Sequence, residues 1–160
     1  VATEELCDVN EVLVQVRKVL KEKIEMKNAA IAHGAFKNIK IQPFRLLIVL
    51  KNLLQNSIKY SGALKPQILI YETITEERYT ITIQDNGIGI PEADQKSVFK
   101  PYKRASNVGK VKGTGIGLNT CRSLMRAAGG DISFKSPLSE VPGQPGTAFY
   151  LEFPIDMVVK

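Results

Sequence analysis

A strand-like alternation near the middle of the chain constrains its fold more than any other feature. From Arg78 to Asp85, bulky apolar side chains alternate with threonine and glutamine, and Gln67 to Ile74 form a second β-rich segment just before them. Alternation with a period of two is typical of a strand with one buried face. The two segments therefore predict a hairpin that turns at Glu76-Glu77.

Three segments outside this hairpin carry apolar residues at helical spacing. The first, from Asn10 to about Lys27, predicts one amphipathic helix. The second begins at Pro43, a residue favoured in the first turn of a helix, and is expected to run to about Tyr60. The third starts near Leu118 and ends at the pair Gly129-Gly130.

The remaining segments are short strands and one long loop. Ala29 to Ala32 predict a strand, and two more are expected at about Asp131 to Ser136 and Thr147 to Phe153. Gly87 to Gly113 are rich in Gly, Pro, Lys and Asn, with helical character only from Glu92 to Phe99. A loop of this length inside a compact domain is usually a functional lid or disordered.

Length and composition limit the classes of protein. A chain of 160 residues with 44% hydrophobic content can bury a sizeable core, so one domain over residues 1–160 is expected. The longest apolar run, Leu46 to Leu50, is far shorter than the roughly 20 residues that cross a bilayer. Because the first residue is Val1 rather than Met, we expect a fragment, and membrane anchoring of the parent protein is left open.

Charge and cysteine content exclude two further kinds of site. The net charge is +6, but the basic residues are spread along the chain without the dense block typical of nucleic-acid binding. Cys7 and Cys121 are far apart and form neither a CxxC pair nor a metal-binding pattern. A reduced, cytoplasmic compartment fits best.

The second predicted helix carries polar residues on one face. Asn52, Asn56, Lys59 and Tyr60 follow at helical spacing. An amide oxygen is a suitable Mg²⁺ ligand, so Asn56 could bind the metal and Lys59 could offset the charge of a phosphate. A solvated polar stripe would explain the pattern equally well if the helix stood alone. The opposite face is apolar and comprises Leu46, Leu47, Leu50, Leu54 and Ile58.

A DxGxG pattern follows directly from the second strand of the hairpin. The carboxylate of Asp85 can accept a hydrogen bond from an exocyclic amine such as that of adenine. Gly87 and Gly89 permit close approach of the backbone. Alone the pattern is weak, because Asp-Asn-Gly is also a common turn composition.

Glycines at positions 113, 115 and 117 open the third predicted helix. Backbone N–H groups and the positive end of the helix dipole make such a segment a site for phosphate. Dinucleotide-binding folds use similar spacing, but no suitable strand precedes this one.

The order of these patterns resembles the boxes of the GHKL ATPase superfamily, specifically its histidine-kinase branch. After the asparagine helix and DxGxG come Phe99-Lys100-Pro101-Tyr102, then GxGxGL, then Gly143 to Phe149. The resemblance covers Asn10 to Pro154. The third box departs from the usual FxPF only by ending in tyrosine.

The resemblance implies an α+β fold, a two-layer sandwich in which a mixed sheet packs on three helices. Nucleotide would bind between the helices and an ATP lid at about residues 91–114. The implied function is to bind ATP with Mg²⁺ and donate the γ-phosphate to a histidine on a separate dimerisation domain. The implied partners are that domain, a response regulator receiver domain and a second copy in the full-length protein, without nucleic acid.

Residue by residue, the resemblance implies catalytic roles for Asn52, Asn56 and Lys59, with Asn56 as the Mg²⁺ ligand. Tyr60 would lie near the nucleotide, and Arg104 or Lys112 would reach the terminal phosphate. The implied nucleotide-binding residues are Asn52, Asn56, Lys59, Tyr60, Asp85, Gly87, Gly89, Ile90, Tyr102, Arg104, Lys112, Gly113, Thr114, Gly115, Gly117, Leu118 and Thr147.

Two alternatives remain open. One is a degenerate nucleotide-binding or docking module, and the other is an anti-sigma-type serine kinase. Related ATPases and those serine kinases carry a glutamate where this chain has Asn52, which favours transfer to histidine over hydrolysis of ATP. His33 lacks the Glu and Pro of the acceptor motif, so a structural or surface role is expected.

Overall fold

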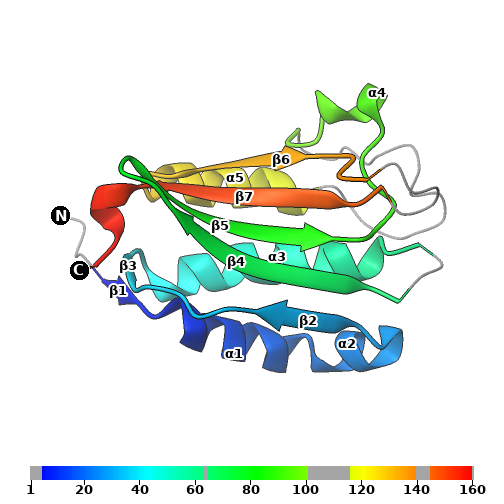
Figure 1. Ribbon diagram of the computed structural model, residues 1–160, viewed down its shortest axis with the longest axis horizontal. Coiled ribbons are helices and arrows are strands. Elements are labelled where there is room, and N and C mark those ends of the chain that lie inside the picture. The colour runs from blue at the N-terminus through cyan, green and yellow to red at the C-terminus, as the bar shows by residue number, and fades with distance from the viewer. Residues whose placement is uncertain (1–4, 63–64, 101–115, 140–144, 160) are drawn as a thin grey trace.

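The computed structural model arranges the main strands in one sheet, with the three longest helices in a layer against it (Figure 1). The structure describes residues 5–62, 65–100, 116–139 and 145–159. The helices are α1 (Val9–Val19), α2 (Lys21–Lys27), α3 (Pro43–Lys59), α4 (Glu92–Gln95) and α5 (Ile116–Ala127), with a 3-10 turn η2 (Ile155–Met157). The strands are β1 (Leu6–Cys7), β2 (Ala30–His33), β3 (Ile39–Lys40), β4 (Gln67–Ile74), β5 (Arg78–Asp85), β6 (Asp131–Lys135) and β7 (Thr147–Pro154).

The main sheet is mixed and has the strand order β2-β4-β5-β7-β6. β2 runs parallel to β4, whereas the other neighbours are antiparallel. The predicted β4–β5 hairpin is confirmed with the expected bounds, and Ile74 pairs with Tyr79 next to the turn. Ile81 and Ile83 are fully buried, which fixes the register because a slip by one residue would expose both.

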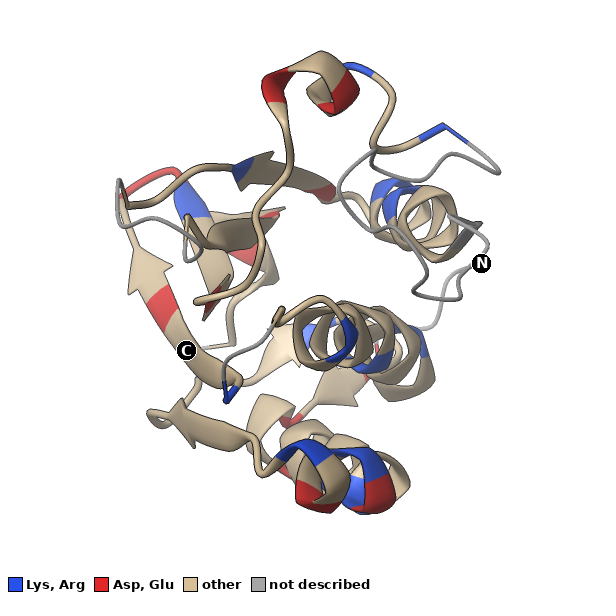
Figure 2. Cartoon of the chain, turned by 90° about the vertical axis from the view of Figure 1, so that its right-hand side faces the viewer, with Lys and Arg blue, Asp and Glu red and all other residues tan. Residues whose placement is uncertain are grey.

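Three helices cover one face of this sheet. Figure 2 shows α1, α3 and α5 together on one side of it, and α3 packs against both of the others. Leu50 and Leu54 of α3 are fully buried in a core that also contains Ile81 and Leu151 from the sheet. Each such side chain contributes roughly 1.5–3 kcal/mol by leaving water. The predicted α+β sandwich is thereby confirmed.

The first predicted helix is divided in two. The carboxylate of Asp8 caps α1 by accepting hydrogen bonds from the backbone N–H groups of Asn10 (3.0 Å) and Glu11 (3.4 Å). At Leu20 the backbone leaves helical geometry, with φ −95° and ψ 9°, before α2 begins. The side chain of Leu20 is buried, and the apolar spacing continues through the break, so periodicity could not reveal it.

The apolar face of α3 is wider than predicted. Val49, Leu53 and Ser57 are buried in addition to the expected residues, whereas Leu47 is only partly buried. The reason is that α3 lies between α1 and α5 as well as against the sheet. A helix packed on several sides buries more than one apolar stripe.

Short elements were predicted least well. β1 and β3 pair antiparallel but have two residues each, too few to show alternation. β2 begins and ends one residue later than expected. The helix expected to reach Phe99 is the four-residue α4, followed by turns such as the one closed by Lys100 N–H and Ser97 C=O.

No helix in the described part of the chain is long and apolar enough to cross a membrane. Cys7 and Cys121 are buried and unpaired, as their spacing predicts. Burial raises the pKa of each thiol to about 12, helped at Cys7 by the charge of Asp8. Both therefore remain protonated and act as packing residues, as does the fully buried Met125.

Candidate nucleotide-binding site

The carboxylate of Asp85, at the end of β5, accepts hydrogen bonds from three separate segments. Its Oδ1 accepts from the backbone N–H of Gly87 (2.9 Å) and of Thr147 (3.2 Å), and its Oδ2 accepts from the Ser57 hydroxyl (2.8 Å). Burial raises the pKa of this carboxyl, and the three hydrogen bonds oppose that rise. A carboxylate has about four acceptor positions. One position on Asp85 therefore remains for a further donor.

Sequence reasoning missed Ser57. Its side chain is only 5% exposed and lies on α3 among buried leucine and isoleucine residues. A buried hydroxyl requires a hydrogen-bond partner, so a serine at an apolar helix position was the available signal. The partner itself, Asp85, is 28 residues away in sequence and could be found only from the fold.

Two glycines allow the backbone segments of this site to approach closely. A Cβ at Gly87 would lie 2.6 Å from the carbonyl oxygen of Tyr60, and a Cβ at Gly146 would lie 2.5 Å from that of Asp85. Gly146 also has a φ of +73°, which disfavours other residues. The Gly146 N–H donates to the Gly87 carbonyl at 3.0 Å. The end of β5 is thus joined to both the end of α3 and the start of β7.

Ser136 links the segment after β5 to the same region and was also missed from sequence. Its hydroxyl accepts from the backbone N–H of Ile90 (2.9 Å) and donates to the Gly146 carbonyl (2.8 Å). The Thr147 hydroxyl lies 3.2 Å from it. Gln95 donates to the carbonyl groups of both Ile90 and Ser136. These bonds fix Ile90 and Thr147, two of the predicted site residues, in one network.

At Gly89, a further predicted site residue, protein atoms already occupy the space beside the backbone. A Cβ there would meet the Pro145 ring at 2.8 Å and the Ser136 hydroxyl at 3.1 Å. The absence of a side chain at Gly89 is therefore explained by contacts within the protein itself.

Asn52 of α3 faces the beginning of α5. A Cβ at Gly117 would lie 3.8 Å from both Cγ and Oδ1 of Asn52. The Cys121 thiol donates to the Val49 carbonyl (3.9 Å), and the side chain of Asn52 partly opposes the effect of burial on the thiol pKa. Leu118, next to Gly117, is partly buried against the core. The structure thus brings together the asparagine helix and the described end of the glycine-rich segment, as expected.

Asn56, one turn further along α3, is half-buried. Within the described residues, no hydrogen bond engages its side chain, so its amide oxygen is available to a ligand. The Lys59 ammonium lies 5.9 Å from the ring centroid of Tyr60. The Tyr60 carbonyl accepts from the Ile88 N–H at 3.0 Å. The polar face of α3 thus ends beside the DxGxG turn.

Some predicted residues cannot be placed. Tyr102, Arg104, Lys112, Gly113, Thr114 and Gly115 lie outside the described residues. The part of the chain that the structure describes contains no group of three or more His, Cys, Asp or Glu residues that could hold a metal by themselves. A metal here would need phosphate oxygens or water beside an amide such as that of Asn56.

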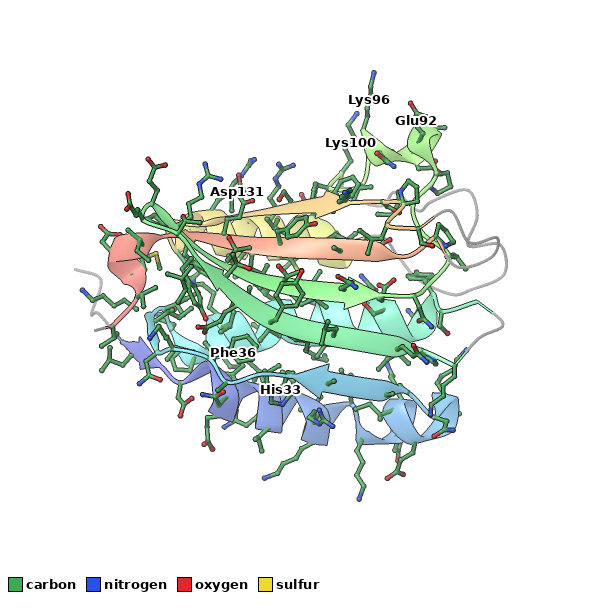
Figure 3. The ribbon with its side chains drawn as sticks, in the orientation of Figure 1. His33, Phe36, Glu92, Lys96, Lys100 and Asp131 are labelled. Carbon is green, nitrogen blue, oxygen red and sulfur yellow. The ribbon has the colours of Figure 1, made fainter. Side chains whose placement is uncertain are left out.

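His33 has the surface position expected for it. Its side chain is exposed, its Nδ1 lies 2.8 Å from the Gly34 carbonyl oxygen, and its ring is 6.1 Å from that of Phe36. Figure 3 shows both residues on the β2 side of the sheet.

Residues 41–157 match the family described as "Histidine kinase-, DNA gyrase B-, and HSP90-like ATPase". The chain belongs to this family. The matched span includes α3, the DxGxG turn, α5 and β7. The predicted kinship with the GHKL ATPases is therefore confirmed.

This histidine kinase-like ATPase domain is similar to parts of sensor kinases. It is 33% identical over 148 residues to phytochrome-like protein Cph1 of Synechocystis sp., covering 92% of this chain and 19% of that protein. It is 35% identical over 126 residues to adaptive-response sensory kinase SasA of Synechococcus sp., covering 77% of this chain and 31% of that protein. The chain therefore spans less than a third of either relative.

Solved structures of histidine kinases have the same fold as this chain. The catalytic domain of histidine kinase ThkA superposes with a TM-score of 0.76 at 25% identity, covering 94% of this chain and 96% of that one. A mycobacterial sensor histidine kinase, MprB, has the same fold, with a TM-score of 0.77 at 21% identity and coverage of 94% and 97%. The domain thus has the fold of histidine kinase catalytic domains.

Proposed function

We propose that this domain binds Mg-ATP and donates the γ-phosphate to a histidine on a separate dimerisation domain of its parent sensor kinase. The observation that carries the proposal is the carboxylate of Asp85, which is held by three hydrogen bonds and retains one acceptor position. An exocyclic amine such as that of adenine would donate to this position. Gly87 and Ile90 would flank the base.

The triphosphate would lie between α3 and the start of α5. Backbone N–H groups and the helix dipole at the start of the 12-residue α5 favour an anion there. Asn52 and Asn56 would serve the phosphate and metal region, with the amide oxygen of Asn56, which no described residue engages, as a Mg²⁺ ligand. Lys59 would offset phosphate charge, and bound Mg²⁺ would neutralise more of it.

Residues outside the described ranges complete the proposed site. Gly113, Thr114 and Gly115 would admit the phosphates, and Arg104 or Lys112 would reach the terminal one. Tyr102 would lie near the nucleotide. These assignments rest on the order of the sequence patterns, together with the position of Gly117 beside Asn52.

Transfer to an imidazole is favoured over hydrolysis of ATP. Activation of water requires a base, whereas a neutral imidazole already offers a lone pair. α3 contains no Asp or Glu, so this helix supplies no carboxylate beside the proposed phosphate region. The domain would act mainly by positioning the substrate and neutralising charge.

The lengths of the relatives support a further domain in the parent protein. Because sensor kinases such as SasA are far longer than this chain, we propose that a dimerisation domain with the acceptor histidine belongs to the parent protein. We also propose that two copies of the parent protein pair and that a response regulator receiver domain accepts the phosphate next. The proposed location is the cytoplasm.

Incubation with γ-labelled Mg-ATP and the dimerisation domain of the parent protein tests this function. We expect label on that domain that is lost in acid and retained in base, as phosphohistidine requires. Acid-stable label would instead favour the serine-kinase alternative. Nucleotide binding without any transfer would favour a degenerate binding module.

An Asp85→Asn variant tests the proposed base-binding role of Asp85. It should lower transfer because less ATP is bound. Wild-type transfer by this variant at low ATP concentration would contradict the role of Asp85.

A further inference from the structure

A cavity of about 520 Å³ lies between the segment that follows α4, the helix α5 and the edge strand β6. Its volume is within the range of about 300–1,000 Å³ that is usual for small-molecule sites. Asn52, Asn56, Asp85 and Gly117 are not among its lining residues. It is therefore separate from the proposed nucleotide site.

Four cationic side chains line this cavity. Arg122 and Arg126 lie one turn apart on α5, and Lys96 and Lys100 come from the segment on the other wall. Figure 2 shows the basic positions of α5 beneath the arch formed by α4 and the residues after it. The acidic residues of α4 do not line the cavity.

Described carboxylates nearby compensate only part of this charge. Oδ1 of Asp131 lies 3.2 Å from the Nε of Arg126 and 3.6 Å from that of Arg122. Glu152, which accepts a hydrogen bond from Ser133 of the cavity wall, is itself paired with Arg78 at 3.4 Å. Lys96 and Lys100 form no ion pair within the described residues.

Figure 3 shows Lys96 and Lys100 close together beside α4, and Asp131 further away at the start of β6. The two lysines thus lie away from the carboxylate that pairs with the arginines. The cavity keeps an excess of positive charge, concentrated at the lysine end.

The guanidinium group of Arg122 packs on an aromatic ring, and among the described residues its Nε has an ion-pair partner but no hydrogen-bond acceptor. Its guanidinium carbon lies 4.3 Å from the centroid of the Phe99 ring, and Phe99 lies 5.9 Å from Phe134 on the opposite wall. The Nε of Arg122 is buried and has no hydrogen-bond partner among the described residues, because its nearest carboxylate oxygen, Oδ1 of Asp131, lies 3.6 Å away. A buried N–H donor requires an acceptor. An acceptor atom brought by a ligand in the cavity would provide one.

We propose that this cavity is a binding site for a small anion that carries carboxylate or phosphate groups, held by Lys96, Lys100, Arg122 and Arg126. Planar guanidinium groups bind such anions through paired hydrogen bonds, and lysines add point charges. The phenylalanine rings would contact an apolar part of the ligand. The size of the cavity favours a small molecule over an acidic protein segment.

The test uses citrate as the carboxylate probe and pyrophosphate as the phosphate probe. Binding is followed by calorimetry and by the NMR signal of the Arg122 Nε–H group. We expect saturable binding of at least one probe, with a shift of that signal. The variant Lys96→Gln/Lys100→Gln/Arg126→Gln should weaken binding by at least about tenfold, because it removes three charges that contact the anion.

The matched control is Lys21→Gln/Lys23→Gln/Lys27→Gln on α2, which removes the same charge from another exposed surface and should leave affinity unchanged. If both triple variants weakened probe binding equally, the loss of affinity would be explained by the net charge of the protein alone, and the proposal would be overturned. So would the absence of saturable binding of both probes, or binding of a hexaglutamate peptide alone. If the first variant does not fold, an Arg122 signal unmoved by either probe overturns the proposal by itself.

Discussion

Two parts of the proposed nucleotide site are built differently. In the strand-end cluster, comprising Ser57, Asp85, Gly87, Gly146 and Thr147, the polar groups are already bonded to one another. On the helix face, comprising Asn52, Asn56 and Gly117, the Asn56 amide has no partner within the described residues. Hydrogen bonds within the protein hold the strand-end cluster in place, whereas the helix face retains the Asn56 amide for a ligand.

The comparison implies that the two parts contribute differently to stability and to binding. A group fixed by hydrogen bonds needs no reorganisation when the ligand arrives, but its loss also weakens the fold. A group that waits for the ligand can be removed with little effect on stability. Substitutions in the two parts should therefore separate unfolding free energy from nucleotide affinity.

The largest effect is expected for Gly146→Ala. Its new Cβ would lie 2.5 Å from the Asp85 carbonyl, in a residue whose φ is +73°. The free energy of unfolding should fall by about 3 kcal/mol through overpacking and backbone strain, as measured by urea denaturation. Gly34→Ala is the control, because no atom lies within 4 Å of its added Cβ. Equal stability of the two variants would show that the strand ends are not tightly joined.

Asp85→Asn should have the next largest effect. An amide has one acceptor oxygen, so at least one donor among Gly87, Thr147 and Ser57 loses its partner. We expect a loss of about 2 kcal/mol in unfolding free energy, together with weaker ATP binding in calorimetry. A variant with weaker binding but unchanged stability would place Asp85 with the helix face instead.

Ser57→Ala should cost about 1 kcal/mol of stability, because one oxygen of Asp85 loses its donor. Ser123→Ala, at an exposed position on the neighbouring helix α5, is the matched control. The effect should vanish when Asp85 is already asparagine, as a double-mutant cycle would reveal. Additive losses would show that the two side chains act independently.

The stability of the strand-end cluster should depend on pH through Asp85. Burial raises the pKa of Asp85 above its usual value of 3.8. The folded protein therefore binds a proton at the Asp85 carboxyl more tightly than the unfolded chain does. This contribution to the free energy of unfolding is fully present below about pH 3.8 and is lost as the pH rises through the folded-state pKa of Asp85. Thermal unfolding across this range should show the decline in the wild type relative to Asp85→Asn. If the stability of the wild type and of Asp85→Asn changed with pH in the same way, Asp85 would not be the source of the decline.

Asn56→Ala should have the smallest effect on stability, less than about 0.5 kcal/mol, because no described protein group bonds to this side chain. Mg-ATP affinity should nevertheless fall by at least about tenfold, equivalent to about 1.4 kcal/mol. Calorimetry with and without Mg²⁺ measures this. Gln55→Ala, also half-buried on α3, is the control and should bind normally. Unchanged affinity in Asn56→Ala would remove the proposed metal ligand.

Local patterns predicted the parts of this site that depend on neighbouring residues. The strand that ends at Asp85, the helix that carries Asn56 and the glycine at position 117 were all recognised from spacing. Their meeting was expected only through the resemblance to a known family. The roles of Ser57 and Ser136 were missed because a serine has no distinctive pattern, and their partners come from distant segments.

Local sequence patterns were sufficient to predict the hairpin, the three helical segments and the order of the glycine-rich and asparagine-bearing boxes. These depend on periodicity and on short-range steric preferences, which act between neighbours along the chain. The packing of distant segments placed β7 between β5 and β6 and brought Lys96 and Lys100 to the same cavity as Arg122 and Arg126. Such features depend on contacts between distant residues, and these form only when the layers pack together.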